Sequence, residues 1–91
     1  MATAIMLELP DVTKEQYDAV WRDLGTDGRL LEGNMFHAGG PMPGGWWALD
    51  VWESPETAQR QFEDVLAPIL AKNNFPQVQP RIFDVDRVVR E

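Results

Sequence analysis

The sequence predicts one α+β domain over residues 1–91, in which a four-stranded antiparallel sheet carries two helices on one face. Short segments alternate apolar and polar residues, as strands do. Two longer segments repeat their apolar residues at helical spacing. These segments follow one another in the order β-α-β-β-α-β, and a chain of this length suits a single domain.

The first strand is predicted over Ala2 to Leu9, and the first helix follows it. Ile5, Leu7 and Leu9 share one side of the strand, so that side should be packed. The helix should run from Thr13 to Leu24, because TKEQ has the pattern of a capping box and glycines follow the last turn. Its apolar residues are Tyr17, Val20, Trp21 and Leu24.

The second and third strands are predicted over Leu30 to Ala38 and Gly45 to Glu53, joined as an antiparallel hairpin by the turn GGPMPG. Alternation in the third strand separates two sets of side chains. Trp47, Leu49 and Val51 form one face, and Trp46, Ala48, Asp50 and Trp52 form the other.

The second helix should begin after Ser54, which has the residue type of an N-cap and precedes a proline at the first helical position. Pro68 should kink this helix or begin a distinct last turn. The final strand is predicted over Arg81 to Val89. The apolar residues of the helix are Ala58, Phe62, Val65, Leu66, Ile69 and Leu70.

This order of elements is that of the ferredoxin-like split βαβ fold, in which both helices cover the same face of the sheet. We expect the other face to carry Met6, Trp46 and Trp52. Two exposed tryptophans would make a large apolar patch. The sequence therefore predicts a homodimer that packs sheet against sheet.

Composition excludes several classes of function. The formal charge of -7 would repel nucleic acid and anionic membranes, and no apolar run is long enough to span a bilayer. The absence of cysteine excludes disulfides, thiol nucleophiles and thiolate metal sites. The first residues lack the pattern of a signal peptide, so we expect a soluble, cytoplasmic protein.

Four segments carry a resemblance to a known family: EQYDAVW, FHAGG, GGWWALDVWES and RIFDVDRVV. The chain resembles the dimeric α+β-barrel superfamily, especially its small antibiotic-biosynthesis-monooxygenase-like proteins, many of which have no assigned function. The resemblance implies that two ferredoxin-like protomers form a barrel, each with a pocket between sheet and helices. It also implies several possible activities: cofactor-independent oxidation of aromatic polyketides, haem degradation, isomerisation, or binding without catalysis.

His37 and Asp50 are the candidate catalytic residues. His37 is the only histidine and could act as a general base near neutral pH; alternatively, it orders the hairpin. Asp50 shares a strand face with Trp46 and Trp52, which we expect to point into the barrel. It could be an acid or base, or the partner of an arginine or an indole N–H.

Tyr17, Trp21 and Trp47 could line a pocket between sheet and helices and bind a small aromatic ligand, although aromatic residues at these spacings also form ordinary core. No second histidine and no cysteine could complete a metal site, and no sequence motif for a cofactor is present. Two functions remain open. The chain is a cofactor-independent monooxygenase or a cyclase/isomerase acting on an aromatic or polyketide-like molecule, or it is a non-catalytic binding or structural dimer.

Overall fold

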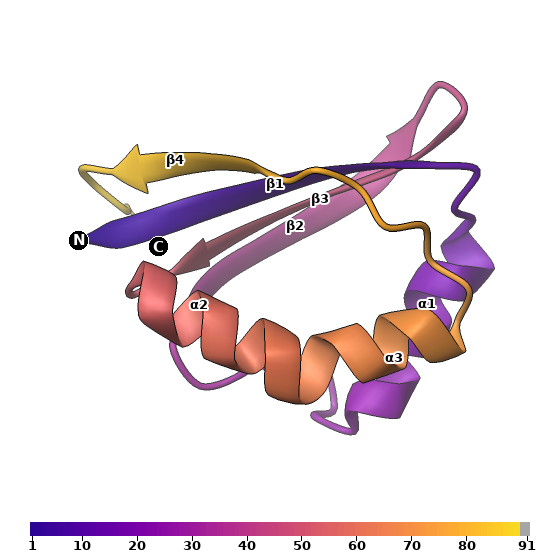
Figure 1. Cartoon of the computed structure of the whole chain (residues 1–91), viewed down its shortest axis with the longest axis horizontal. Coiled ribbons are helices and arrows are strands. Elements are labelled where there is room, and N and C mark those ends of the chain that lie inside the picture. Colours follow the sequence, from indigo (N-terminus) through magenta and orange to yellow (C-terminus); the bar gives the residue numbers. More distant parts are fainter. Residues whose placement is uncertain (90–91) are drawn as a thin grey trace.

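The computed structural model describes residues 1–89 and arranges them as one sheet layer and one helix layer (Figure 1). Figure 1 shows the helices gathered below the sheet, whose opposite face is left without a helix in the described part of the chain. The last two residues of the predicted domain lie outside the described residues. The elements are β1 (Ala2–Pro10), α1 (Lys14–Leu24), β2 (Asn34–Met42), β3 (Gly45–Trp52), α2 (Pro55–Gln61), the π-helical turn η1 (Phe62–Leu66), α3 (Ala67–Lys72) and β4 (Arg81–Val85).

The sheet has the strand order β2-β3-β1-β4, and all of its pairings are antiparallel. The chain is thus an α+β protein with a four-stranded antiparallel sheet, as the sequence predicts, and the arrangement is compatible with a ferredoxin-like fold. β4 is shorter than the predicted strand Arg81 to Val89, because its pairing with β1 ends where Val85 faces Ala2.

The β2–β3 hairpin is longer and its turn tighter than the sequence suggested. The predicted strand Leu30 to Ala38 is wrong at both ends, because β2 spans Asn34–Met42. Met42 already pairs with Gly45, so only two residues connect the strands, and the second of them, Gly44, has a φ of 78°. That positive φ favours glycine. Gly39 and Gly40, expected in the turn, lie inside β2.

Both helix starts carry the predicted caps. The hydroxyl of Thr13 accepts from the backbone N–H of Gln16 at 3.2 Å, and the Gln16 side chain accepts from the Thr13 N–H at 2.9 Å. The Ser54 hydroxyl accepts from the N–H of Thr57 at 3.1 Å. These bonds satisfy N–H groups that have no partner within the helix. Gly25 ends α1 in the left-handed conformation, with a φ of 68°.

The second helical segment is continuous but changes its hydrogen-bond spacing. The N–H of Ala67 donates to the carbonyl of Phe62, which is the spacing of a π-helical turn, and α3 then continues through Lys72. Pro68 follows immediately and cannot donate a backbone hydrogen bond. The predicted irregularity at Pro68 is therefore confirmed, as a π-helical turn between two short α-helices.

The prediction that Trp46 and Trp52 lie on the open face of the sheet is wrong. In the register with β1, Trp46 pairs with Leu9 and Trp52 pairs with Thr3. Leu9 and Thr3 are on the face that the helices cover, and Trp52 is only 2% exposed. A shift of one residue in register exchanges the two faces of a strand, and the sequence did not reveal this register.

The open face carries a continuous apolar row instead. Of the predicted patch, only Met6 is on this face, opposite Leu49. The cross-strand partners show which other side chains belong to it, and Phe36 and Phe83 are its most exposed aromatic residues, at 40% and 49%. We call this set the open-face patch: Ala4, Met6, Phe36, Trp47, Leu49, Val51 and Phe83.

The layer between sheet and helices contains few fully buried residues. Leu9, Val20, Trp52 and Ala58 are buried there. Other residues of the same layer remain half-buried, including aromatic side chains of α1 and β3. These side chains keep part of their surface accessible to solvent. The half-buried residues are Ile5, Leu7, Tyr17, Trp21, His37, Trp46, Asp50, Val65, Leu66 and Ile69.

Candidate functional site

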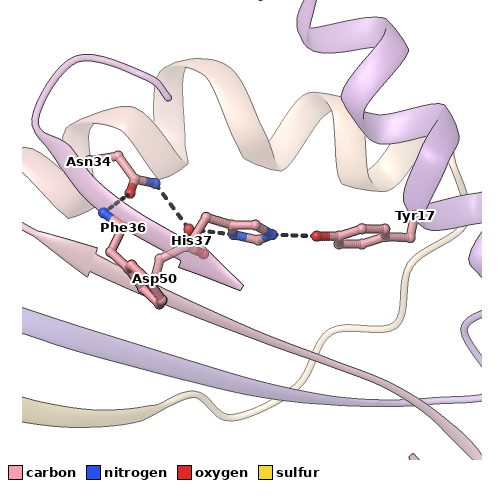
Figure 2. Close-up of polar contacts among 5 residues, drawn as sticks. All are labelled: Tyr17, Asn34, Phe36, His37 and Asp50. Carbon is pink, nitrogen blue, oxygen red and sulfur yellow. Dashed lines mark hydrogen bonds and ion pairs between the residues drawn. The ribbon is translucent and has the colours of Figure 1, made fainter. Parts of the chain in front are cut away.

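A chain of hydrogen bonds links α1 to the central hairpin (Figure 2). The hydroxyl of Tyr17 is hydrogen-bonded to Nε2 of His37, and Nδ1 of His37 lies 2.7 Å from Oδ1 of Asp50. The amide of Asn34 donates to the same carboxylate oxygen at 3.0 Å. The Asn34 carbonyl oxygen in turn accepts from the N–H of Phe36 at 3.1 Å. Each polar group in the row is therefore held by its neighbours.

The hairpin register brings the His37 and Asp50 side chains together. The two residues are direct partners across β2 and β3, so both side chains project from the same face toward the helices. The pairing slips by one residue between Asn34 and Phe36. This bulge brings the Asn34 amide to the carboxylate from the next position of the strand, as bulges re-aim side chains elsewhere.

The contacts decide where the protons lie. A carboxylate oxygen only accepts, so Nδ1 of His37 carries the proton that faces Asp50. In the tautomer with its proton on Nδ1, the imidazole accepts at Nε2 from the hydroxyl of Tyr17. Burial raises the pKa of Tyr17 above its ordinary value. A hydrogen bond with the Trp21 side chain lowers this pKa, and the charge of Asp50 raises it. Tyr17 is therefore a neutral phenol at neutral pH and serves as the donor.

Gly39 makes room for the tyrosine. A Cβ at this position would lie 2.7 Å from the Tyr17 hydroxyl oxygen and 3.0 Å from the ring carbon that bears it. Gly39 is two residues after His37 and therefore on the same strand face. The FH-x-G spacing thus places an imidazole and an unobstructed stretch of backbone side by side, and Tyr17 packs over both.

Aromatic rings enclose the imidazole. The Trp21 ring meets the His37 ring edge to face, with centroids 5.1 Å apart. Tyr17 stacks on His37 at 5.8 Å and lies 5.1 Å from Trp46. The indole N–H of Trp46 is buried, and no acceptor for it is present among residues 1–89. The site therefore combines flat apolar walls with an acid–base group and one donor that a ligand could engage.

Four of the five residues proposed from the sequence come together here: Tyr17, Trp21, His37 and Asp50. Trp47 does not. It alternates with Trp46 along β3, belongs to the open-face patch and pairs with Gly40. Its predicted place in the sheet–helix pocket is wrong, because the register assigns that face to Trp46.

Sequence reasoning missed Asn34, Gly39 and Trp46. The pairing between Asp50 and His37 was within reach of the sequence: a two-residue turn ending at Gly44 places them directly opposite each other. The role of Asn34 depends on a bulge, and sequence spacing gives no signal for a bulge. The role of Gly39 depends on where α1 docks, which only the packed structure determines.

The site is screened from solvent but not sealed. The side chains of His37 and Asp50 are 15% and 20% exposed. Among residues 1–89 the surface has hollows, two of which bear on the site's surroundings. One lies at the chain ends, between Met35 and the segment after β4. The other lies beside α1 and includes Trp21, which also touches the His37 ring.

Within residues 1–89, no three His, Asp or Glu side chains come together as metal ligands would. No helix in that range has the length and apolar character needed to cross a membrane. No protein-family model matches this chain, and comparison with curated proteins gives no significant match.

Proposed function

We propose that this protein binds a flat, enolisable or phenolic aromatic molecule between its sheet and helices and removes a proton from it. The observation that carries the proposal is the hydrogen-bonded chain Tyr17–His37–Asp50. A histidine held by a carboxylate is oriented to accept a proton at its other nitrogen. Here that nitrogen is in contact with a tyrosine, so the tyrosine is the group that meets the ligand.

The proton moves in two linked transfers. The ligand gives a proton to the phenol oxygen of Tyr17 while Tyr17 gives its own to Nε2 of His37. The imidazolium that forms is stabilised by Asp50 at 2.7 Å. The ligand is left as a delocalised anion in a site with little water, where its own electronic structure does the remaining work.

The resulting anion can follow two courses. Return of the proton at another carbon gives an isomerisation or closes a ring. Reaction with dioxygen, which supplies the oxidising equivalents, gives a cofactor-independent oxygenation. The resemblance to antibiotic-biosynthesis-monooxygenase-like proteins supports this second course, and the compatible fold is in keeping with it. Proton removal comes first in both, so it is the step to test.

We also propose that two chains associate through the open-face patch. The patch includes Phe36 and Phe83, which are 40% and 49% exposed, and it has no covering layer among residues 1–89. Burying exposed aromatic surface is favourable by about 25 cal/mol per Å². A second copy laid sheet to sheet would bury the same residues in both chains and complete a barrel.

The alternative is a non-catalytic binding or structural protein. It is favoured by the fact that both nitrogens of His37 already have partners within the chain. In that case the three residues would serve to fix α1 on the sheet. The two functions differ in one measurable property, which is whether His37 speeds proton removal from a bound molecule.

The test uses β-tetralone, a bicyclic aromatic ketone whose hydrogens next to the carbonyl exchange with deuterium when it enolises. NMR should show faster exchange with the wild-type protein than with buffer. The His37→Gln variant should lose that acceleration by ~100-fold, the lower range for a general base, while its circular dichroism is unchanged. Exchange that is equal in both proteins, or equal to buffer, would reject catalysis and leave the structural alternative.

A further inference from the structure

An open hollow of about 570 Å³ lies along the C-terminal half of α1 and the loop that follows it. This volume is within the range of small-molecule sites. Gly25 and Gly28 contribute backbone without side chains, both in the left-handed conformation, so the loop curves away from the helix. The hollow is lined by Asp18, Trp21, Arg22, Gly25, Asp27 and Gly28.

Trp21 belongs both to this hollow and to the candidate site. Its indole meets the imidazole of His37 edge to face at 5.1 Å and the ring of Tyr17 at 6.4 Å. The side chain is half-buried rather than fixed in the core. The indole therefore borders both the hollow and the imidazole of His37.

We propose that this hollow is the entrance to the site of Tyr17 and His37 and that Trp21 is the side chain a ligand displaces to enter it. The inference rests on the function proposed above. Rotation of the indole toward the hollow would uncover the edge of the imidazole without moving the sheet, at the loss of the indole's hydrogen bond to the Tyr17 hydroxyl. Trp21 is then a positioning and access residue, whereas His37 and Tyr17 are the groups that exchange protons.

The net charge of the protein selects the class of ligand. The charges at the hollow itself balance, because Asp18 and Asp27 line it together with Arg22, and Lys14 lies 2.5 Å from Asp18. The whole chain carries a formal charge of -7. Such a field disfavours the approach of anions. The entrance should therefore admit a neutral aromatic molecule, such as naphthol, more readily than naphthalenesulfonate, which has the same rings and a negative charge.

Access to His37 can be measured without knowing the natural ligand. It is the only histidine, so the rate of its modification by diethyl pyrocarbonate reports directly on that imidazole. Trp21→Ala should be modified several-fold faster than the wild type. Trp47→Ala, the same change on the opposite face of the sheet, should react at the wild-type rate. Naphthol should protect the wild type at lower concentration than naphthalenesulfonate does.

A second variant closes the entrance instead of opening it. Arg22 is exposed and lines the hollow, so Arg22→Trp should fill the space. Diethyl pyrocarbonate should then modify His37 more slowly, and naphthol should take longer to protect it. If Trp21→Ala fails to fold, Arg22→Trp alone tests whether the hollow is the entrance. The proposed entrance would be rejected if the rate of His37 modification were unchanged in Arg22→Trp, or if it were equal in Trp21→Ala and Trp47→Ala. Equal protection by the two ligands would overturn charge selection.

The two proposals can fail separately. Modification rates measure access to the imidazole, whereas deuterium exchange into β-tetralone measures proton removal. Suppose that His37 is modified faster in Trp21→Ala, but that deuterium exchange into β-tetralone is the same in His37→Gln and the wild type. This result would support the proposed entrance and reject the catalytic function. If instead His37→Gln slows the exchange but Trp21→Ala does not speed the modification of His37, His37 acts as the base and its entrance lies elsewhere.

Discussion

Nδ1 of His37 and Oδ1 of Asp50 are 2.7 Å apart because the two residues are direct partners in the β2–β3 ladder. The hairpin alone sets this pair, through a turn of two residues and strands of fixed pleat. α1 adds Tyr17 from outside the hairpin. His37 and Asp50 are thus joined by the most local tertiary contact of the chain, while the contact with Tyr17 depends on helix docking.

Asp50→Asn should reduce stability and abolish proton removal together. The amide keeps the shape of the carboxylate but loses its charge, so its oxygen accepts more weakly from Asn34 and His37. Weakening both hydrogen bonds should lower the free energy of unfolding by about 1–3 kcal/mol, measured by urea denaturation. Asp64→Asn, an exposed position in η1, is the control and should match the wild type. Full exchange activity in Asp50→Asn would contradict the role given to Asp50.

The titration of Tyr17 should be shifted upward, and it can be read alone because the chain has one tyrosine. Burial disfavours the phenolate, so absorbance titration should give a midpoint above the ordinary pKa of 10.0. A raised folded-state pKa means that the folded protein keeps the proton longer than the unfolded chain does. The stability it confers is complete below pH 10 and is lost as pH rises through the folded pKa.

The matching variant for this titration is Tyr17→Phe, which lacks the phenol. Its free energy of unfolding should therefore fall less steeply with pH above pH 10 than that of the wild type. A tyrosine midpoint at or below 10.0 in the folded protein would mean that the phenol is not held in the buried position between α1 and β2.

Gly39→Ala should displace Tyr17 and disturb the site. The new methyl group would lie 2.7 Å from the phenol oxygen, closer than van der Waals contact permits. Forcing the ring aside should cost about 1–3 kcal/mol of unfolding free energy. Gly40→Ala is the matched control, because its Cβ points to the opposite face and lies 3.3 Å from the Trp47 indole nitrogen. An undisturbed tyrosine titration in Gly39→Ala would contradict the packing described here.

Neighbouring residues of β4 test the proposed dimer. Phe83 belongs to the open-face patch, whereas Ile82 pairs with Ile5 on the helix side and is 61% exposed. Phe83→Glu should convert a dimer to a monomer in sedimentation velocity, because it would bury a charge in the sheet-to-sheet contact. Ile82→Glu should leave the dimer intact. A wild-type protein that sediments as a monomer at micromolar concentration would refute the association.

The sequence by itself determined the element order, the starts of both helices and the end of the first. Period-two and helical patterns, the capping box at Thr13 and the Ser54 cap act within a few residues, so they can be recognised from spacing alone. The same local rules singled out His37 and Asp50 and placed Asp50 with Trp46 on one strand face.

Only the tertiary structure decided which face of β3 the helices cover. Both faces carry tryptophan and aliphatic residues, so hydrophobic pattern could not distinguish them, and Asp50 made the inner face look the more polar. The pairing of Trp46 with Leu9 decides it, and that contact joins residues far apart in the chain. Register between distant strands depends on the packing of the whole domain. This is why Trp46, not Trp47, lies beside Tyr17 at the site.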